Sequence, residues 1–162
     1  MPHNEGAELK TTRRLGTALI ILGLITTTGT WAAPKDSPCC TVTSPFGSSP
    51  ALAWSWGASP SGTIGGGGGS GAGKANFQDL SLTRTSDGQS PQYLHALAAG
   101  THLPTLVLVD GPATITLMDV LVTSYSTGGS TGPLTENISF NFGGLTYTVN
   151  GVTTCVGTGC SQ

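Results

Sequence analysis

Four cysteines are the residues of this 162-residue chain whose chemistry is easiest to interpret: Cys39, Cys40, Cys155 and Cys160. An even number of cysteines in an exported chain is typical of disulfides. A Cys39–Cys40 bridge would close a strained ring across one peptide bond. We therefore expect each N-terminal cysteine to pair with a C-terminal one, and the sequence leaves the two such pairings open. Bridges over more than 100 residues would stabilise the fold by roughly 4–5 kcal/mol.

A zinc site built from all four thiolates is the alternative reading of these cysteines. The spacing of Cys155 and Cys160 is close to that of zinc ligands. The direct adjacency of Cys39 and Cys40 fits a tetrahedral site poorly, however. The sequence thus favours disulfides and predicts neither a metal nor another cofactor.

Two glycine-rich stretches imitate catalytic motifs. Gly68-x4-Gly73-Lys74 resembles a phosphate-binding loop, but Ala75 replaces the magnesium-binding Ser or Thr and a strand pattern follows instead of a helix. Gly128-x-Ser130-x-Gly132 matches the pattern of a nucleophile elbow, but Pro133 and a further strand follow it. Neither stretch predicts nucleotide binding or hydrolysis.

Two histidines, His95 and His102, lie beyond the N-terminal apolar run, and either could act as a general base. No aspartate lies at a spacing that suggests a partner, so we interpret both as surface or capping residues. A small secreted hydrolase would require a nucleophile and a base that meet only in the folded chain. The sequence predicts that the protein is not an enzyme.

Residues 1–32 have the pattern of an export signal. Lys10, Arg13 and Arg14 precede an apolar run over residues 15–25 that is short for a membrane span. Small residues follow, and we expect cleavage after Ala32, with an uncleaved anchor as the alternative. The mature chain would then be secreted or periplasmic, with no membrane span.

The charge of the predicted mature chain excludes one class of partner. After removal of residues 1–32, three basic residues remain against six acidic ones, a formal net charge of −3. Such a chain has no basic patch, and nucleic acid is therefore not an expected partner.

The remaining residues predict a mainly β domain with one helix. Residues 33–50 are rich in Pro, Ser and Thr and indicate an irregular arm, followed by a single domain over residues 51–162. Alternating patterns predict strands over residues 52–57, 76–85, 105–109, 114–126 and 137–149. The helix is expected over about residues 91–99, with Ser90 as its N-cap, an apolar stripe of Tyr93, Leu94 and Leu97, and Gly100 as its C-cap.

Two of these predicted strands have unusual patterns. Residues 114–126 are apolar on both faces, which predicts a central strand covered on two sides. Residues 137–149 alternate, but Gly143-Gly144 shifts the parity by one, which predicts a bulged strand. Asn150-Gly151 then suits a type I′ hairpin turn leading into residues 152–156.

The order and spacing of several segments resemble the haemolysin-coregulated protein (Hcp) family, the tube subunits of bacterial type VI secretion. The resemblance covers about residues 52–149. It rests on LAWSWG at 52–57, the glycine tract ending in Gly73-Lys74, NFQDL at 76–80, DGQSP at 87–91, GTH at 100–102, ITLMDVLV at 115–122 and ENISFNF at 136–142.

This resemblance implies a compact barrel of two packed antiparallel sheets with one short helix. It also implies a homohexameric ring, stacking of rings into a tube and a non-enzymatic role, which the predicted export signal would place outside the bacterial membrane. A secreted protein partner is a further expectation, and a monomeric secreted barrel that binds a surface polymer or protein is the alternative. By analogy with the family, the loop that contacts a neighbouring ring would be Gly65, Gly66, Gly67, Gly68, Gly69, Ser70, Gly71, Ala72, Gly73 and Lys74.

Overall fold

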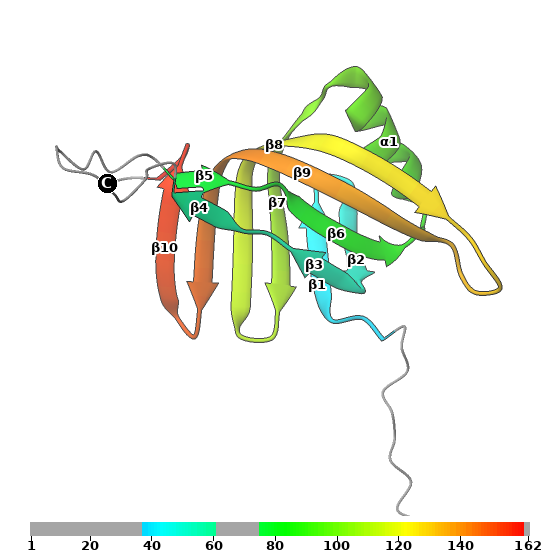
Figure 1. Ribbon diagram of the computed structural model, residues 1–162, viewed down its shortest axis with the longest axis horizontal. Coiled ribbons are helices and arrows are strands. Elements are labelled where there is room, and N and C mark those ends of the chain that lie inside the picture. The colour runs from blue at the N-terminus through cyan, green and yellow to red at the C-terminus, as the bar shows by residue number, and fades with distance from the viewer. Residues whose placement is uncertain (1–36, 61–74, 161–162) are drawn as a thin grey trace, which may run out of the picture. The chain divides into compact units, whose positions relative to one another are not determined.

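The computed structural model describes residues 37–60 and 75–160, in which antiparallel strands predominate (Figure 1). The predicted signal peptide and the glycine tract lie outside these residues. One helix, α1 (Ser90–Ala99), accompanies ten strands: β1 (Cys40–Ser44), β2 (Gly47–Ala51), β3 (Ala53–Ser55), β4 (Ala58–Pro60), β5 (Ala75–Phe77), β6 (Leu80–Thr85), β7 (His102–Asp110), β8 (Ala113–Gly128), β9 (Thr135–Val149) and β10 (Val152–Gly157). No described helix is both long and apolar enough to cross a membrane.

The large sheet curls until its two ends meet, which confirms the predicted barrel. Its strand order is β2-β1-β7-β8-β9-β6-β3, and β10 pairs with β9 outside this path. The end strands β2 and β3 are consecutive in the chain: β2 pairs with β1, whereas β3 pairs with β6. Leu52 lies between them, and its N–H donates to the carbonyl of Thr83. Residues 47–55 therefore form a seam that joins the two ends of the sheet.

The irregular arm expected over residues 33–50 is wrong for residues 40–50, which form the β1–β2 hairpin. Val42, Ser49 and Ala51 are buried while their strand neighbours Thr41, Thr43, Ser48 and Pro50 are exposed, so the hairpin has the two-residue period of a half-buried sheet. Its inward side chains are small, which makes the pattern faint. Pro50 indicated a loop, but a strand at the end of a sheet tolerates a residue without an N–H.

The sheet bends along one row that crosses three strands, at Pro104, Asp119 and Gly143. The pairings on either side are regular, for example Thr105 with Met118 and Val120 with Phe142, but this row is skipped. Asp119 has a φ of 54°, which breaks the alternation of the pleat. As a consequence, buried residues change between odd and even positions at this row in all three strands. In β7 they are Leu103 before the row and Leu106 and Leu108 after it; in β8, Ile115 and Leu117 before and Val120 and Val122 after; in β9, Ile138 and Phe140 before and Leu145 after.

This bend accounts for both unusual strand patterns. β8 is central, between β7 and β9, as predicted, but its two apolar faces reflect the change of parity and not double coverage. The parity change at Gly143-Gly144 is present as well. However, it is shared across the sheet and involves no register shift, and the shift between β8 and β9 lies instead between Val122 and Ser124.

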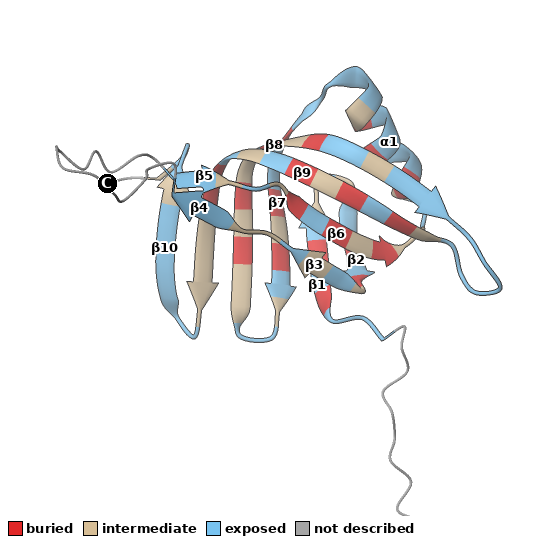
Figure 2. Ribbon diagram, in the orientation of Figure 1, coloured by how far each residue is buried: buried red, intermediate tan, exposed pale blue. Residues whose placement is uncertain are grey.

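Buried positions recur along the strands of the curled sheet (Figure 2), and the core cluster that they form is mostly aliphatic. Phe140 and Tyr93 are its large aromatic members, and their rings meet edge to face at 5.8 Å between centroids. Fully buried positions include Val42, Leu80, Leu106, Leu108, Ile115, Leu117 and Val120.

The helix forms where predicted, with differences in detail. Gly100 adopts the left-handed conformation (φ 61°), and Thr101 N–H donates to the Ala96 carbonyl, so the predicted C-cap is confirmed. Gln89, not Ser90, is the N-cap; the Ser90 hydroxyl instead accepts from the Asp87 N–H at 2.9 Å. The buried stripe consists of Ser90, Tyr93 and Ala96, while Leu94 is 49% exposed.

Candidate functional site

A two-stranded sheet brackets the glycine tract that the sequence analysis singled out. β4 and β5 pair antiparallel, with Pro60 opposite Ala75. The tract itself, including Gly65 to Lys74, lies between them and outside the described residues. Pro60 and Ala75, the described residues on either side of positions 61–74, therefore lie side by side. We call the β4–β5 pair the stem of this segment.

Aromatic side chains join the stem to the barrel. Trp56 lies just before β4 and meets Tyr147 of β9 edge to face, at 5.6 Å between ring centroids. Phe77 of β5 stacks against Trp56 at 6.5 Å and contacts Phe142 at 6.2 Å. Each such aromatic pair contributes about 0.5–1.5 kcal/mol beyond the burial of its area. These ring contacts therefore fix the stem on β9.

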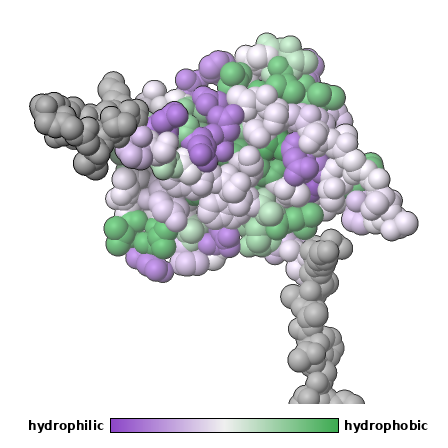
Figure 3. Space-filling model, viewed as in Figure 1, coloured by the Kyte–Doolittle hydropathy of each residue, from purple (hydrophilic) through white to green (hydrophobic). Residues whose placement is uncertain are grey.

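A free strand edge lies next to this stem along β10. Within the described residues β10 pairs only with β9, and most of its side chains are exposed. Hydrophobic surface covers the end of the β9–β10 hairpin (Figure 3), where Val152 is 75% exposed. Asn150 and Gly151 have φ values of 50° and 80°, which confirms the predicted type I′ turn.

The cysteines pair differently from the expectation. Cys155 and Cys160 form a disulfide, with their Cα atoms 5.6 Å apart, while Cys39 and Cys40 are free thiols. The expected long-range bridges are wrong because β7, β8 and β9 lie between β1 and β10 in the sheet. A zinc site with four thiolate ligands is excluded by the same separation. Among residues 37–60 and 75–160, no three His, Cys, Asp or Glu side chains are grouped to hold a metal ion.

One histidine does have an acidic partner, which corrects the sequence analysis. His102 Nδ1 lies 2.7 Å from Asp119 Oδ1, because the bend in β8 turns that carboxylate toward β7. Both side chains are more than half exposed. His95 lines a hollow of about 380 Å³ beside Phe46 and Thr101, with no acidic residue in its lining. Neither histidine therefore combines an acid with a nearby serine.

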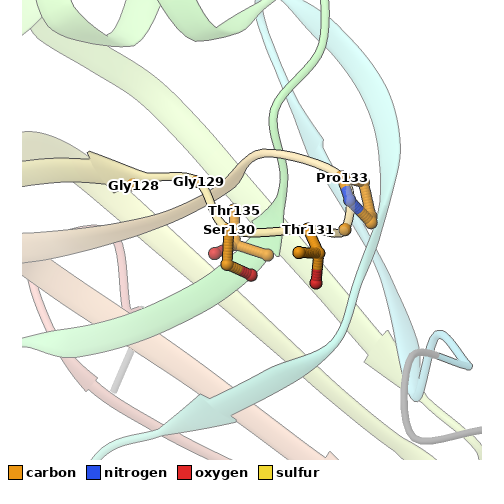
Figure 4. Close-up of a pocket in the computed structure, with 7 residues that line it drawn as sticks. Gly128, Gly129, Ser130, Thr131, Pro133 and Thr135 are labelled. Carbon is orange, nitrogen blue, oxygen red and sulfur yellow. The ribbon is translucent and has the colours of Figure 1, made fainter.

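The elbow-like motif lies in the turn between β8 and β9. Ser130 lines an open hollow of about 530 Å³ formed by Gly128, Gly129, Thr131, Gly132, Pro133 and Thr135 (Figure 4). No histidine or acidic residue contributes to this hollow. The lining of this hollow thus offers Ser130 no general base, and the motif matches the sequence pattern of a nucleophile elbow without its geometry.

A buried ion pair, which the sequence analysis did not identify, is the most polar feature of the interior. Arg84 on β6 and Glu136 on β9 are fully buried and directly opposite in register, with Nε 2.5 Å from Oε1. Burial by itself would lower the pKa of Arg84. The hydrogen bond and charge of Glu136 outweigh that effect and raise the pKa.

Further bonds from this pair connect four parts of the barrel. Arg84 also donates to Ser49 of β2 and to the Asp87 carboxylate, the latter at 2.6 Å. Glu136 accepts from the Tyr125 hydroxyl of β8 at 2.8 Å. The guanidinium lies 5.1 Å from the centre of the Tyr93 ring of α1. The only signal in the sequence was an arginine in phase with Leu80 and Leu82 on the inward face of a predicted strand. Its pairing with Glu136 depends on strand order.

Comparison with known proteins agrees with this fold. The family described as "Type VI secretion system effector, Hcp" matches residues 47–149, well over half of the chain. Protein hcp1 of Pseudomonas aeruginosa is 48% identical over 80 residues, which cover 43% of this chain and 49% of that protein. The chain thus spans about half the length of this curated relative.

Solved structures show the same fold at low sequence identity. One described as a type six secretion system protein has a TM-score of 0.64 at 23% identity, over 75% of this chain and 93% of that one. A type VI secretion system effector from Yersinia pestis has a TM-score of 0.62 at 19% identity, over 74% and 99%. Hcp1 from Salmonella typhimurium has a TM-score of 0.60 at 20% identity, over 72% and 90%. Together with the family match over residues 47–149, this fold shows that the chain belongs to the Hcp family of type VI secretion system effectors.

Proposed function

We propose that this chain is a non-enzymatic subunit that is exported and assembles into hexameric rings. The rings stack through the glycine tract, Gly65 to Lys74, into a tube-like assembly in the bacterial envelope or the medium. No nucleic acid is involved, and any further partner is a secreted protein.

The stem is the observation on which this proposal depends most. Four aromatic rings fix β4 and β5 to the body of the barrel. These ring contacts fix β4 and β5, which flank the glycine tract, a segment too rich in glycine to have a core of its own. A rigid base lowers the entropy cost of holding such a segment against a neighbouring subunit.

A closed ring requires two unlike surfaces on each subunit that meet head to tail. The free edge of β10 is a suitable candidate for one of them, because its unpaired N–H and C=O groups can accept a strand or loop from a second copy. No side chain of β10 is larger than valine, and most of its residues are exposed, which leaves the backbone edge accessible.

Export is supported by the charged and apolar pattern of residues 1–32. A disulfide between Cys155 and Cys160 agrees with an oxidising compartment.

The mass of the exported protein tests the ring. The full chain is expressed in a bacterium with a secretion pathway, and the exported material is analysed by mass spectrometry and by light scattering after gel filtration. We expect a chain that begins at Ala33 and an assembly of six copies. A monodisperse monomer would contradict the ring and favour a monomeric binding module on the same barrel.

Two variants test the role of the tract and its stem. Deletion of residues 65–74 should leave single rings but abolish stacking in electron micrographs. Trp56→Ala should have the same effect, because it removes two of the three aromatic contacts of the stem. Deletion of residues 129–132 in the β8–β9 turn is the matched control and should stack normally. Unchanged stacking in both of the first two variants would show that the tract is not the contact.

A further inference from the structure

Cys39 and Cys40 form an unusual pair at the beginning of β1. Consecutive residues in a strand direct their side chains to opposite faces of the sheet. Here the two sulfur atoms lie 2.7 Å apart, and both face the Ala51 carbonyl oxygen, at 3.5 and 3.9 Å. The chain has thus turned both thiols to one side, where they are in contact with each other.

The two thiols differ sharply in their access to solvent. Cys39 is exposed, whereas Cys40 is 7% exposed. Burial raises the pKa of Cys40 to about 12, and its bond to Cys39 adds to this effect. A reagent in solution therefore reaches Cys39 first, while Cys40 remains a shielded thiol in contact with its neighbour.

We infer that Cys39 and Cys40 are a reversible dithiol–disulfide pair whose oxidant is a small-molecule disulfide. The Cys39 thiol gives up its proton to water, and its thiolate attacks one sulfur of the oxidant, forming a mixed disulfide. The first leaving thiolate takes up that proton from water and departs as a thiol. The Cys40 sulfur then attacks Cys39 Sγ, and the second leaving thiolate takes up the Cys40 proton. Two protein thiols become one disulfide, and the oxidant is reduced to two thiols.

Reversibility follows from the geometry of neighbouring residues. Consecutive Cα atoms are about 3.8 Å apart across a trans peptide, shorter than the roughly 4.4–6.8 Å of ordinary disulfides. The ring is therefore strained and easily reduced. Cys155 and Cys160, with Cα atoms 5.6 Å apart, lie within the ordinary range.

The position of the pair gives its oxidation a structural effect. Cys39 N–H donates to the Ala51 carbonyl at 2.9 Å, and Cys40 is the strand partner of Ala51. Ala51 is the last residue of β2 before the seam passes to β3. Closing the small ring constrains the backbone of both cysteines and so disturbs the bond from the Cys39 N–H to the Ala51 carbonyl, which lets the redox state affect pairing in the middle of the seam.

The test uses the folded full chain, first treated with a mild dithiol and then with oxidised glutathione, followed by non-reducing peptide mapping. In the wild type we expect the peptide with Cys39 and Cys40 to lose two hydrogens and to retain no glutathione. Cys40→Ser should keep glutathione on Cys39, because no second thiol displaces it. Cys39→Ser should leave Cys40 unmodified.

Two controls separate this pair from the other disulfide. The double variant Cys155→Ser/Cys160→Ser should show the same loss of two hydrogens. Mild reduction should restore the protection of the Cys39 amide, which donates to the Ala51 carbonyl, in hydrogen exchange without opening the Cys155–Cys160 bridge. A lasting glutathione adduct in the wild type, or a cross-link from Cys39 to Cys155 or Cys160, would overturn the inference.

Discussion

Arg84 illustrates how one side chain can organise a small barrel. It is the single lysine or arginine among the described residues, and it is fully buried. A buried charge is costly unless its partners are well placed. Here Glu136, Asp87 and Ser49 all accept from its guanidinium. The pair thus fixes β6 against β9 and directs β2 and the start of the helix toward the same point.

Glu136→Gln should lower the free energy of unfolding by about 3–5 kcal/mol, because it leaves the Arg84 charge buried without its counter-charge. Equilibrium urea unfolding, followed by tryptophan fluorescence, measures the loss. Asp87→Asn is the matched control; the Asp87 side chain is 36% exposed, so its replacement should cost less than about 1 kcal/mol. Equal losses in the two variants would contradict a special role for the buried pair.

Stability at high pH should depend on Cys40. The pKa of this thiol is about 12 in the fold and near 9.0 when unperturbed, so the folded state holds the proton more tightly than the unfolded state. Its contribution is complete below pH 9.0 and is lost as pH rises toward about 12. We expect the urea midpoint of the reduced protein to fall above pH 9.

The same titration of Cys40→Ala isolates this effect from that of Tyr93, whose pKa is also raised by burial. The variant should have a flatter profile between pH 9 and 10 than the wild type. Parallel profiles would show that Cys40 does not contribute.

At the residue scale the sequence alone indicated little of this chemistry. Nothing in the local sequence distinguishes Arg84, Glu136 and Asp119 from other polar residues of alternating strands. Their roles depend on which strands become neighbours in the sheet. The His102–Asp119 contact spans 17 residues and arises because Asp119 interrupts the pleat. The pairing of the cysteines was likewise decided by strand order, which spacing along the chain does not reveal.

At the scale of elements, the bent row explains why strand types were easier to predict than strand faces. Alternation identifies a strand, and β8, β9, β10 and the helix lie close to their expected positions. The single strand expected over residues 76–85 is instead divided at Gln78 and Asp79 into β5 and β6. A change of parity within a strand can mean double coverage, a bulge or a bend. The sequence of one strand does not distinguish these cases, because the bend is shared with its two neighbours.

Gly144→Ala should disturb the open end of the β9–β10 hairpin, where Gly144 pairs with Gly157, far from the turn. A Cβ at Gly144 would overlap the backbone of Thr158, whose N–H donates to the Gly143 carbonyl at 2.8 Å. We expect a loss of about 1–3 kcal/mol, measured by thermal or urea unfolding, because backbone cannot move aside as a side chain can. Gly128→Ala is the control, since no atom lies within 4 Å of its Cβ. A neutral Gly144→Ala would contradict the close approach.

At the scale of the whole molecule, the described surface has acidic groups without basic ones. Asp79, Asp87, Asp110 and Asp119 are at least partly exposed, while Arg84 is buried. Two copies meeting through these surfaces cannot form a carboxylate–guanidinium pair. Assembly through them must use backbone edges, hydroxyl groups and apolar contacts.

We therefore expect rings that do not dissociate at high salt. Raising the ionic strength from about 0.1 to 1 M shortens the screening length from about 10 to 3 Å and weakens repulsion between acidic copies. Light scattering of the exported chain across this range should show equal or greater assembly. Dissociation at 1 M salt would indicate that ion pairs hold the subunits together.

The family and the barrel could be predicted from the sequence because segment order and spacing survive even where single motifs are weak. The hairpin formed by β1 and β2 could not, since its inward residues are small and its prolines indicate a loop. Closure of the sheet depends on that hairpin. The predicted barrel therefore lacked the β1–β2 hairpin and, with it, the residues that join the two ends of the sheet.

The seam also bears on the order in which the chain folds. β7, β8, β9 and β10 are successive antiparallel neighbours, so they can pair as local hairpins. Residues 47–55, in contrast, join β1, which depends on β7 far along the chain, to β6, which depends on β9. Such distant pairings form slowly because a long loop must close first. The meander is therefore expected to act as the folding nucleus, and substitutions in the seam should accelerate unfolding while leaving the refolding rate nearly unchanged.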